Sequence, residues 1–240
     1  MSIIDKKSKT MSRSSSIVYN EKDYINLKES YIRLKDNILF YNVDGKNNVI
    51  QVTSSVQGEA KTTTISNLAV SLAQDGKKVV CVDLDIRKPR LHRAFNIENV
   101  DGLSEYMLNT IDMDGLIKHT EYGVDIINRG SEFSNSAVIL LSEKLKNLIK
   151  TLKTQYDYVL IDTPPVLIVS DFIHISRLAD GLLFVVAYGR TKKAQVKEAI
   201  SQLKKNNIRF IGCVFTFYDP KRNEKNAYTN YGYYNYGDKK

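Results

Sequence analysis

Hydrophobic residues recur along this chain in two alternating patterns, short β-branched runs and longer amphipathic stretches. Apolar runs predict strands at 49–53, 78–83, 124–127, 156–162, 181–187 and 209–216. Apolar residues three or four positions apart predict helices at 23–40, 62–74, 102–107, 137–154 and 192–206. This alternation favours an α/β fold with a doubly wound, mostly parallel sheet and helices on both faces.

The first predicted strand runs into a small polar loop and a helix start, in the string TSSVQGEAKTTT that begins at Thr53. Such a loop directs backbone N–H groups and a helix N-terminus at one point, which favours a polyphosphate. Lys61 would reach the β- and γ-phosphates, and the Thr62 hydroxyl would ligate Mg²⁺. Ser55 and Ala60 depart from the G-x-x-x-x-G-K-[ST] pattern, and a plain polar connection is the alternative. Since an alanine with φ > 0 would cost roughly 1–2 kcal/mol, we expect an ordinary helical φ at Ala60.

Carboxylates stand at the ends of two further predicted strands. Asp83 and Asp85 follow the second strand, and Asp162 ends the strand 156–162. Ligands bind outside the carboxyl ends of an open parallel sheet, so we expect these side chains near the phosphate loop. One carboxylate would hold Mg²⁺ or its water, and another would accept the proton of an attacking hydroxyl. For each Asp alone a cap or turn role is an equal alternative, but their joint placement with Lys61 favours function.

Composition narrows the class of protein. With 240 residues, 42% hydrophobic content and a formal net charge of +8, the chain suits one core with basic ends. The excess charge would suit nucleic acid, an acidic membrane surface or a polyphosphate, or it reflects solvated ends alone. Cys81 and Cys213 lie in separate strand-like runs, which favours buried thiols and a reducing cytoplasm. No apolar run is long enough to span a membrane, and no signal peptide is recognisable.

The two ends of the chain differ from its centre. Residues 1–20 are rich in Ser and Lys and predict a flexible basic extension, whereas residues 21–217 predict the folded domain. Residues 218–240 contain tyrosines interleaved with Asn and Gly, which predicts a disordered tail. Over the 20 residues from Thr216 to Tyr236 a flexible segment would span ~25 Å, enough to approach its own site or that of a neighbour.

Together these strings resemble the bacterial tyrosine kinases, or BY-kinases, which are P-loop kinases of capsular and extracellular polysaccharide synthesis. TSSVQGEAKTTT resembles their Walker A loop, VDLDIRKPRLH their Walker A′ segment and VLIDTPP their Walker B strand. The terminal tyrosine cluster resembles their autophosphorylated tail. The resemblance extends from Glu29 to Thr216 and implies a P-loop NTPase-like fold, ATP and Mg²⁺ as cofactors, and transfer of the γ-phosphoryl group to tyrosine.

The resemblance also implies roles for individual residues. The catalytic set would be Lys61, Asp83, Asp85 and Asp162, in which Asp83 accepts the tyrosine proton and Asp85 assists. Mg²⁺ would be bound by Thr62, Asp83 and Asp162. The nucleotide would be bound by Ser55, Gly58, Glu59, Ala60, Lys61, Thr62 and Thr63. The phosphorylated residues would be Tyr228, Tyr231, Tyr233, Tyr234 and Tyr236.

Partners follow from the same resemblance. A separate transmembrane adaptor of the polysaccharide co-polymerase type would activate this cytoplasmic kinase at the inner face of the plasma membrane, and a tyrosine phosphatase would reverse the modification. A homo-oligomer would form through the tail and the first helix, where family members carry an E-x-x-R-x-x-R motif. Here the matching positions are Glu29, Ile32 and Lys35, and Lys lacks the bidentate fork of Arg. A ring would therefore need a substitute such as Arg33 on a rotated helix.

Two other functions stay open at this point. A partition or positioning ATPase of the ParA/MinD kind would share the fold, but those proteins carry an additional Lys at the start of the phosphate loop, and residues 53–57 contain none. A scaffold that binds DNA or membranes would depend on the basic ends, and its binding would fall steeply with salt. The few basic residues near the tail and the lack of a recognisable nucleic-acid module argue against a nucleic-acid partner.

Overall fold

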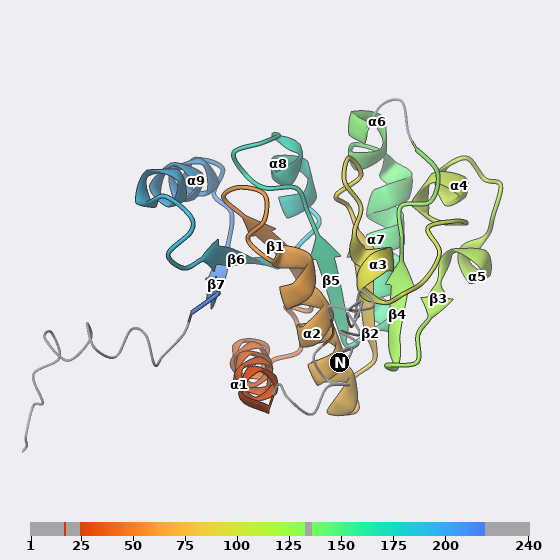
Figure 1. The fold of residues 1–240 in the computed structure, drawn as a ribbon. Coiled ribbons are helices and arrows are strands. Elements are labelled where there is room, and N and C mark those ends of the chain that lie inside the picture. The colour runs from red at the N-terminus through yellow and green to blue at the C-terminus, as the bar shows by residue number, and fades with distance from the viewer. Residues whose placement is uncertain (1–16, 18–24, 133–135, 219–240) are drawn as a thin grey trace, which may run out of the picture.

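The computed structural model describes residues 25–132 and 136–218, together with Ile17. Its centre is a seven-stranded sheet with the strand order β3-β4-β2-β5-β1-β6-β7 (Figure 1). The strands are β1 (Val49–Ser54), β2 (Val79–Asp83), β3 (Lys118–His119), β4 (Val124–Ile127), β5 (Tyr158–Asp162), β6 (Gly181–Ala187) and β7 (Phe210–Thr216). All neighbouring strands are parallel except β3 and β4. The doubly wound, mostly parallel sheet predicted from the sequence is confirmed.

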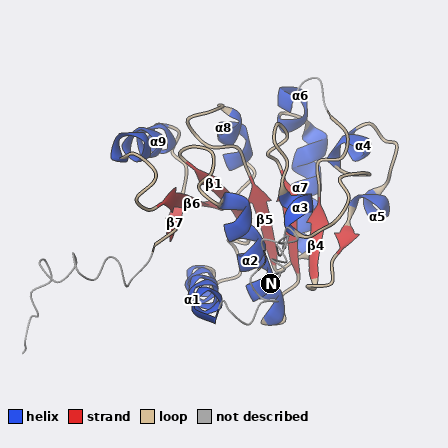
Figure 2. Ribbon diagram, in the orientation of Figure 1, coloured by secondary structure: helices blue, strands red, loops and turns tan. Residues whose placement is uncertain are grey.

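Helices surround this sheet, as Figure 2 shows by colour. Within the described residues they are α1 (Ile25–Tyr41), α2 (Lys61–Gln74), α3 (Leu91–Ala94), α4 (Leu103–Met107), α5 (Met113–Leu116), α6 (Ser136–Leu140), α7 (Glu143–Gln155), α8 (Asp171–Ser176) and α9 (Lys193–Lys205). In this part of the chain no helix combines the length and the hydropathy needed to cross a bilayer.

Alternate residues of the strands pack on opposite faces of the sheet, as the pleat requires. On one face Val52 belongs to a buried cluster with Leu68 of α2 and Ile38 of α1. On the other face Val159 belongs to a cluster with Leu148 of α7, and a third cluster lies between β6 and the helices α8 and α9. Both faces are therefore covered, which explains why the parallel strands are apolar throughout.

The predicted element boundaries are mostly close to the observed ones. Strands 124–127 and 181–187 match the structure, and the other predicted strands differ at their ends by one or two residues. Gly76 ends α2 as a C′ glycine with φ +78°, as expected. The N–H of Gly76 bonds to the carbonyl of Ala73 at 2.9 Å and that of Lys77 bonds to the carbonyl of Leu72 at 3.1 Å, which is the Schellman arrangement.

The predicted single helix at 137–154 is wrong, because two helices, α6 and α7, occupy this region. Ser142 divides them. Its hydroxyl accepts the N–H of Leu145 at 3.1 Å and donates to the carbonyl of Ile139 at 2.8 Å. A serine that caps a helix N-terminus offers the backbone an alternative to a continuous helix. The short elements α3, α5, α8 and β3 were not predicted, since so few residues show no clear periodicity.

The two cysteines differ in exposure, which corrects the expectation that both thiols are buried. Cys81 lies in the buried strand β2, whereas Cys213 is exposed. Cys213 belongs to β7, the edge strand next to β6 in the described sheet, and it is one of the residues of β7 that are exposed to solvent. The predicted flexible extension lies outside the described residues except for Ile17, which is buried in the core. The predicted tail lies outside them except for Tyr218.

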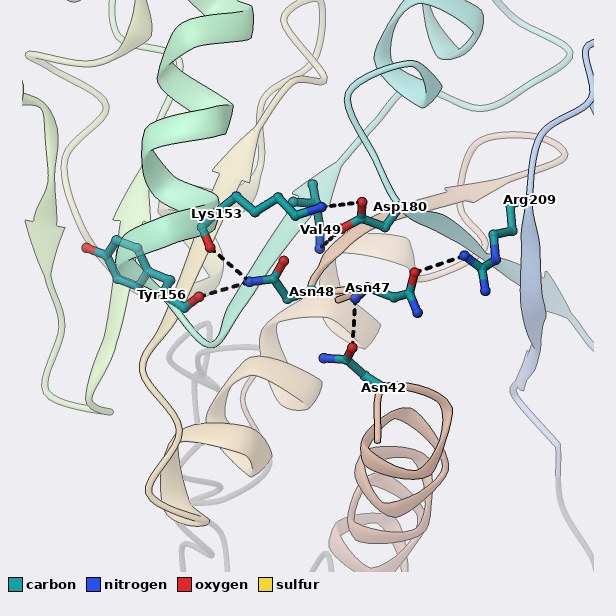
Figure 3. A network of polar contacts seen from close by, with 8 residues as sticks. All are labelled: Asn42, Asn47, Asn48, Val49, Lys153, Tyr156, Asp180 and Arg209. Carbon is teal, nitrogen blue, oxygen red and sulfur yellow. Dashed lines mark hydrogen bonds and ion pairs between the residues drawn. The ribbon is translucent and has the colours of Figure 1, made fainter. Parts of the chain in front are cut away.

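A polar network fixes the end of the sheet at which β1 begins (Figure 3). Its members are Asn42, Asn47, Asn48, Val49, Lys153, Tyr156, Asp180 and Arg209. The Asn48 amide donates to the carbonyls of Lys153 and Tyr156 at 3.1 Å each. The N–H of Val49 donates to the carboxylate of Asp180 at 2.9 Å. These bonds hold α7 and the segment before β6 against β1, the strand that leads into the phosphate loop.

Candidate functional site

The candidate site lies at the carboxyl ends of three neighbouring strands, β2, β5 and β1. Asp162, the last residue of β5, is in register with Asp83 of β2 and with Val52 of β1. The loop after β1 and the start of α2 stand directly beyond this level. Strand register thus brings two carboxylates that are far apart in sequence to the phosphate loop, as the sequence predicted for this edge of the sheet.

The phosphate loop turns through two left-handed residues. Gly58 has φ +82°, and Ala60 has φ 64° and ψ 33°, so the expected helical φ at Ala60 is wrong. The Ala60 carbonyl accepts both the N–H and the hydroxyl of Thr64 at 2.9 Å, while the neighbouring Glu59 is held in the core. These contacts fix the chain on both sides of Ala60, so the surrounding structure outweighs a local cost of roughly 1–2 kcal/mol.

Glu59, predicted to bind nucleotide, has its side chain inside the protein and is only 1% exposed. Its carboxylate accepts the backbone N–H of Val56 at 2.8 Å and that of Ala187 at 3.0 Å, together with the hydroxyl of Thr191. The hydroxyl of Thr216 donates to the Glu59 carbonyl at 3.0 Å. Glu59 therefore braces the phosphate loop against the ends of β6 and β7.

The start of α2 brings a hydroxyl and an ammonium to the carboxylates. The Thr62 hydroxyl donates to Oδ2 of Asp162 at 2.6 Å, while Oδ1 of Asp162 is buried without a hydrogen-bond partner in the described part of the chain. Lys61 is 9% exposed and its positive charge acts on both Asp162 and Asp85. Three of the predicted site residues, Lys61, Thr62 and Asp162, therefore lie together at the start of α2.

Asp83 and Asp85 occupy different positions although they are two residues apart. The fully buried Asp83 accepts the backbone N–H groups of Arg90 and Leu91 at 3.0 Å each, so it anchors the loop that follows β2. The N–H of Asp85 also donates to Asp83, at 3.2 Å. Asp85 itself lines the cavity above the phosphate loop.

Burial raises the pKa of all three carboxyl groups. The pKa of Asp83 lies well above its ordinary range because of burial and then because of the charge of Asp162, although the N–H of Leu91 opposes the shift. Burial raises the pKa of Asp162 to about 6, against the charge of Lys61 and the bond from Thr62. Burial also raises the pKa of Asp85, again against the charge of Lys61. A cation placed among these groups would favour their ionised forms.

A cavity of about 420 Å³ lies between the phosphate loop and the loop after β2. Of the predicted site residues, its lining includes Gly58, Ala60, Lys61, Thr62, Thr63 and Asp85. The other predicted site residues, Ser55, Glu59, Asp83 and Asp162, are buried and do not line this cavity. The lining also contains Lys88, Arg90 and Arg93, which were not predicted as site residues. The run of basic residues after Asp85 was the signal that would have identified them. The predicted phosphorylation sites lie outside the described residues.

The donor set fits a magnesium ion that is shared with a phosphate ligand. Hydroxyl and carboxylate oxygens are hard ligands, and the unpartnered Oδ1 of Asp162 would be satisfied by a metal-bound water. In the described residues no three His, Cys, Asp or Glu side chains are grouped as a complete metal site. Thr62 and Asp162 would therefore hold the ion together with phosphate oxygens and water, which is the usual arrangement for Mg²⁺. Asp83, the third predicted ligand, has its oxygens bonded to backbone N–H groups and would act on the ion mainly through its charge.

The fold and this loop define a P-loop nucleotide-binding protein of the α/β class. A profile described as an AAA domain matches residues 47–207. The tyrosine-protein kinase YwqD of Bacillus subtilis is 36% identical over 86% of this chain and 85% of its own length. A putative tyrosine-protein kinase in the cps region of Klebsiella pneumoniae is 31% identical over 75% of this chain. The solved kinase domain of the Escherichia coli tyrosine kinase ETK has a TM-score of 0.80 and 26% identity, and the match covers 87% of this chain and 82% of that domain.

The chain belongs to the family of bacterial tyrosine-protein kinases, as the motifs in its sequence predicted. Its P-loop kinase fold and its class of enzyme, protein-tyrosine kinase, are those of this family. The chain spans 25% of the length of the Klebsiella pneumoniae relative, whereas it spans most of YwqD.

Proposed function

We propose that this protein is an ATP- and Mg²⁺-dependent kinase that phosphorylates the tyrosine cluster of its own C-terminal tail. The observation that carries the proposal is that Asp162 meets Lys61 and Thr62, which line the nucleotide cavity together with Asp85. Lys61 and the loop N–H groups would bind the β- and γ-phosphates. Thr62 and Asp162 would hold Mg²⁺, which supplies charge neutralisation on the transferring phosphoryl group when bound.

The reaction would transfer the γ-phosphoryl group from ATP to a tyrosine oxygen, which breaks the bond to the β-phosphate and releases ADP. We propose that Asp83 accepts the phenolic proton by way of Asp85, because Asp83 is fully buried whereas Asp85 lines the cavity. Asp85 would assist from the cavity wall. Most of the acceleration would come from positioning and from electrostatic stabilisation.

The proposed biological role is control of capsular or extracellular polysaccharide synthesis and export. The support is the family membership and the cps-region name of one relative. We further propose a separate transmembrane adaptor, a tyrosine phosphatase, and activity at the inner face of the plasma membrane. Each phosphotyrosine adds about −1.5 to −2 charge, so modification of the tail would switch its assembly with neighbouring copies.

A phosphotyrosine mass map after incubation with Mg²⁺ and ATP tests the kinase. The samples are the wild type, Lys61→Met, Lys197→Met as a control at an exposed lysine of α9, and a chain truncated after Asp219. Each is measured with and without the cytosolic tail of a candidate adaptor. We expect phosphate on Tyr228 to Tyr236 in the wild type and Lys197→Met, and none in Lys61→Met. Hydrolysis of ATP with bare tyrosines under every condition would instead favour a positioning ATPase.

A further inference from the structure

A second cavity, of about 320 Å³, lies beside the nucleotide cavity and has a strongly cationic lining. Among the described residues, no Asp or Glu lines it, whereas five Lys and Arg side chains do; they are Arg87, Lys88, Arg90, Arg93 and Arg129. Four of the five come from the loop and short helix that follow Asp85, and Arg129 comes from the segment after β4. None of the residues assigned to the proposed kinase chemistry lines the second cavity.

The positive charge of this cavity is largely unbalanced. Arg87 bonds to Asp171 at 3.4 Å, and Lys88 reaches only the neutral amide of Gln57 at 3.4 Å. Arg90 and Arg93 are exposed, and neither side chain has a hydrogen bond or ion pair in the described residues. The acids beside these five cations are Asp171, which pairs with Arg87, and Asp85, on which the charge of Arg90 acts. A surface on which cations outnumber acids in this way favours an anionic ligand.

The cavity is also fixed in shape by contacts beneath it. Asp83 holds the backbone N–H groups of Arg90 and Leu91, and the Arg129 guanidinium donates to the carbonyl of Ile86 at 3.1 Å. His92 lines the same cavity, and its Nδ1 is buried without a partner in the part of the chain that the structure describes. The site therefore offers cationic side chains on a fixed backbone, together with a polar atom that a ligand would satisfy.

Three cations form a shared wall between the two cavities, since Lys88, Arg90 and Arg93 line both. An anion in the second cavity would therefore lie beside the phosphates of a bound nucleotide. Arg forks bind phosphate in a bidentate manner, and a phosphotyrosine carries about −1.5 to −2 charge. Neighbouring tail tyrosines are one to three residues apart, a span of up to about 10 Å in an extended chain.

We propose that the second cavity binds a phosphotyrosine of an already modified tail and thereby places the next tyrosine at the nucleotide site. The first phosphate would then promote addition of the later ones. This inference rests on the proposed kinase function, and it assigns to that function an order in which the tail is modified. The modified tail comes from the same chain or from a second copy.

Binding of a synthetic peptide tests the site directly. The peptide spans residues 225–240 and carries one phosphate, at Tyr236, or none. The protein is the full chain with its five tail tyrosines changed to Phe, so that its own tail does not compete. We expect the phosphopeptide to bind about tenfold tighter than the bare peptide, as one additional charge-assisted contact provides. Arg87→Gln and Arg129→Gln should each remove most of this difference, whereas the control Lys197→Gln should keep it.

Thermal unfolding shows whether both variants fold. If Arg129→Gln does not fold, the proposal is still tested by Arg87→Gln and by the affinities of the two peptides for the protein with an unchanged cavity. Equal affinity for both peptides would overturn the proposal. The same holds if the two Arg variants retain the difference. Displacement of the phosphopeptide by inorganic phosphate at a concentration equal to the peptide Kd would show a general anion site and would also overturn it.

Kinetics separates this inference from the proposed function. We expect a higher kcat/KM for phosphorylation of the singly phosphorylated peptide than for the bare peptide, and a loss of this preference in Arg87→Gln. If both peptides are phosphorylated at equal rates and bind equally, the kinase stands and the second site is wrong. If neither peptide is phosphorylated, while the phosphopeptide still binds more tightly in a manner that depends on Arg87, the kinase proposal fails and the proposed phosphotyrosine site stands.

Discussion

Asp83 and Asp162 lie opposite each other in the register of β2 and β5, and both carboxyl groups are buried. Burial raises the pKa of both, and the charge of Asp162 raises that of Asp83 further. Two neighbouring buried acids oppose folding when they ionise, so the site carries a cost that a bound cation would remove. The same pair that would serve catalysis therefore controls how stability depends on pH.

The free energy of unfolding without nucleotide should fall as the pH rises through the range of about 4 to 6. In the folded state the pKa of Asp162 is about 6 against an ordinary value of 3.8, so the folded protein binds more protons there than the unfolded chain. Asp162→Asn should be more stable than the wild type at neutral pH, and the difference should vanish below about pH 4. Urea unfolding in the presence of EDTA measures this. Asp114→Asn, at an exposed residue of α5, is the control. Lower stability of Asp162→Asn at neutral pH would contradict the prediction.

Ala60→Gly should raise the free energy of unfolding by up to about 1 kcal/mol, because glycine adopts the left-handed conformation without the methyl clash. The observed φ of 64° is the reason for this expectation. Ala73→Gly, in the last turn of α2, is the matched control and should lower stability by up to about 1 kcal/mol. Chemical denaturation of both variants gives the comparison. A loss of stability in Ala60→Gly would show that the loop is not strained at this residue.

The sheet was predictable from the sequence because its central strands are apolar on both faces, so that runs such as 79–83 and 181–187 stand out. The meeting of Asp83 and Asp162 with Lys61 was predictable for the same reason, since parallel strands end at one edge. The division at Ser142 was harder to predict, because apolar residues continue on both sides and a single hydroxyl decides where the helix restarts.

Side-chain direction could not be predicted from spacing alone. Glu59 lies in the middle of the phosphate loop, yet its carboxylate turns inward to donors from β6 and the following turn, more than a hundred residues away in sequence. Asp83 and Asp85 are equivalent in the sequence pattern. Tertiary contacts alone determine that Asp83 bonds to the loop backbone and that Asp85 lines the cavity. The exposure of Cys213 could be predicted only with the knowledge that β7 is an edge strand.

Glu59→Gln should destabilise the protein by about 2–3 kcal/mol even without nucleotide. The substitution replaces one carboxylate oxygen, which accepts hydrogen bonds, by an NH₂ group, which is itself a donor and would face other donors. The affected partners are the N–H groups of Val56 and Ala187 and the hydroxyl of Thr191. Thr191→Val removes only one of these contacts and should cost about 1 kcal/mol. Thermal unfolding of the nucleotide-free variants distinguishes this brace from a direct nucleotide contact. An unchanged Tm combined with weaker ATP binding would contradict the structural role.

Lys35 stands at the third position of the helix motif that would link subunits, but here it is committed within the chain. Its ammonium bonds to Asp75 at the end of α2 at 3.0 Å and to Asp36 at 3.2 Å, and its side chain is 12% exposed. The hydrogen bond to Asp75 raises the pKa of Lys35, so the pair persists at neutral pH. An interaction of this kind, with a partly exposed acid, contributes about 0.5–1 kcal/mol.

Lys35→Met should therefore lower stability by about 0.5–1 kcal/mol without changing the oligomeric state. Asp75→Asn should have a similar effect, and the double variant should add little, since both changes remove the same bond. Urea unfolding gives the stability of the three variants, and sedimentation velocity gives their assembly. Arg33→Met, at an exposed position of α1, is the comparison that tests whether this residue takes over a subunit contact. A smaller assembly in Lys35→Met alone would mean that Lys35 reaches a partner subunit, and that its bond to Asp75 is not its main contact.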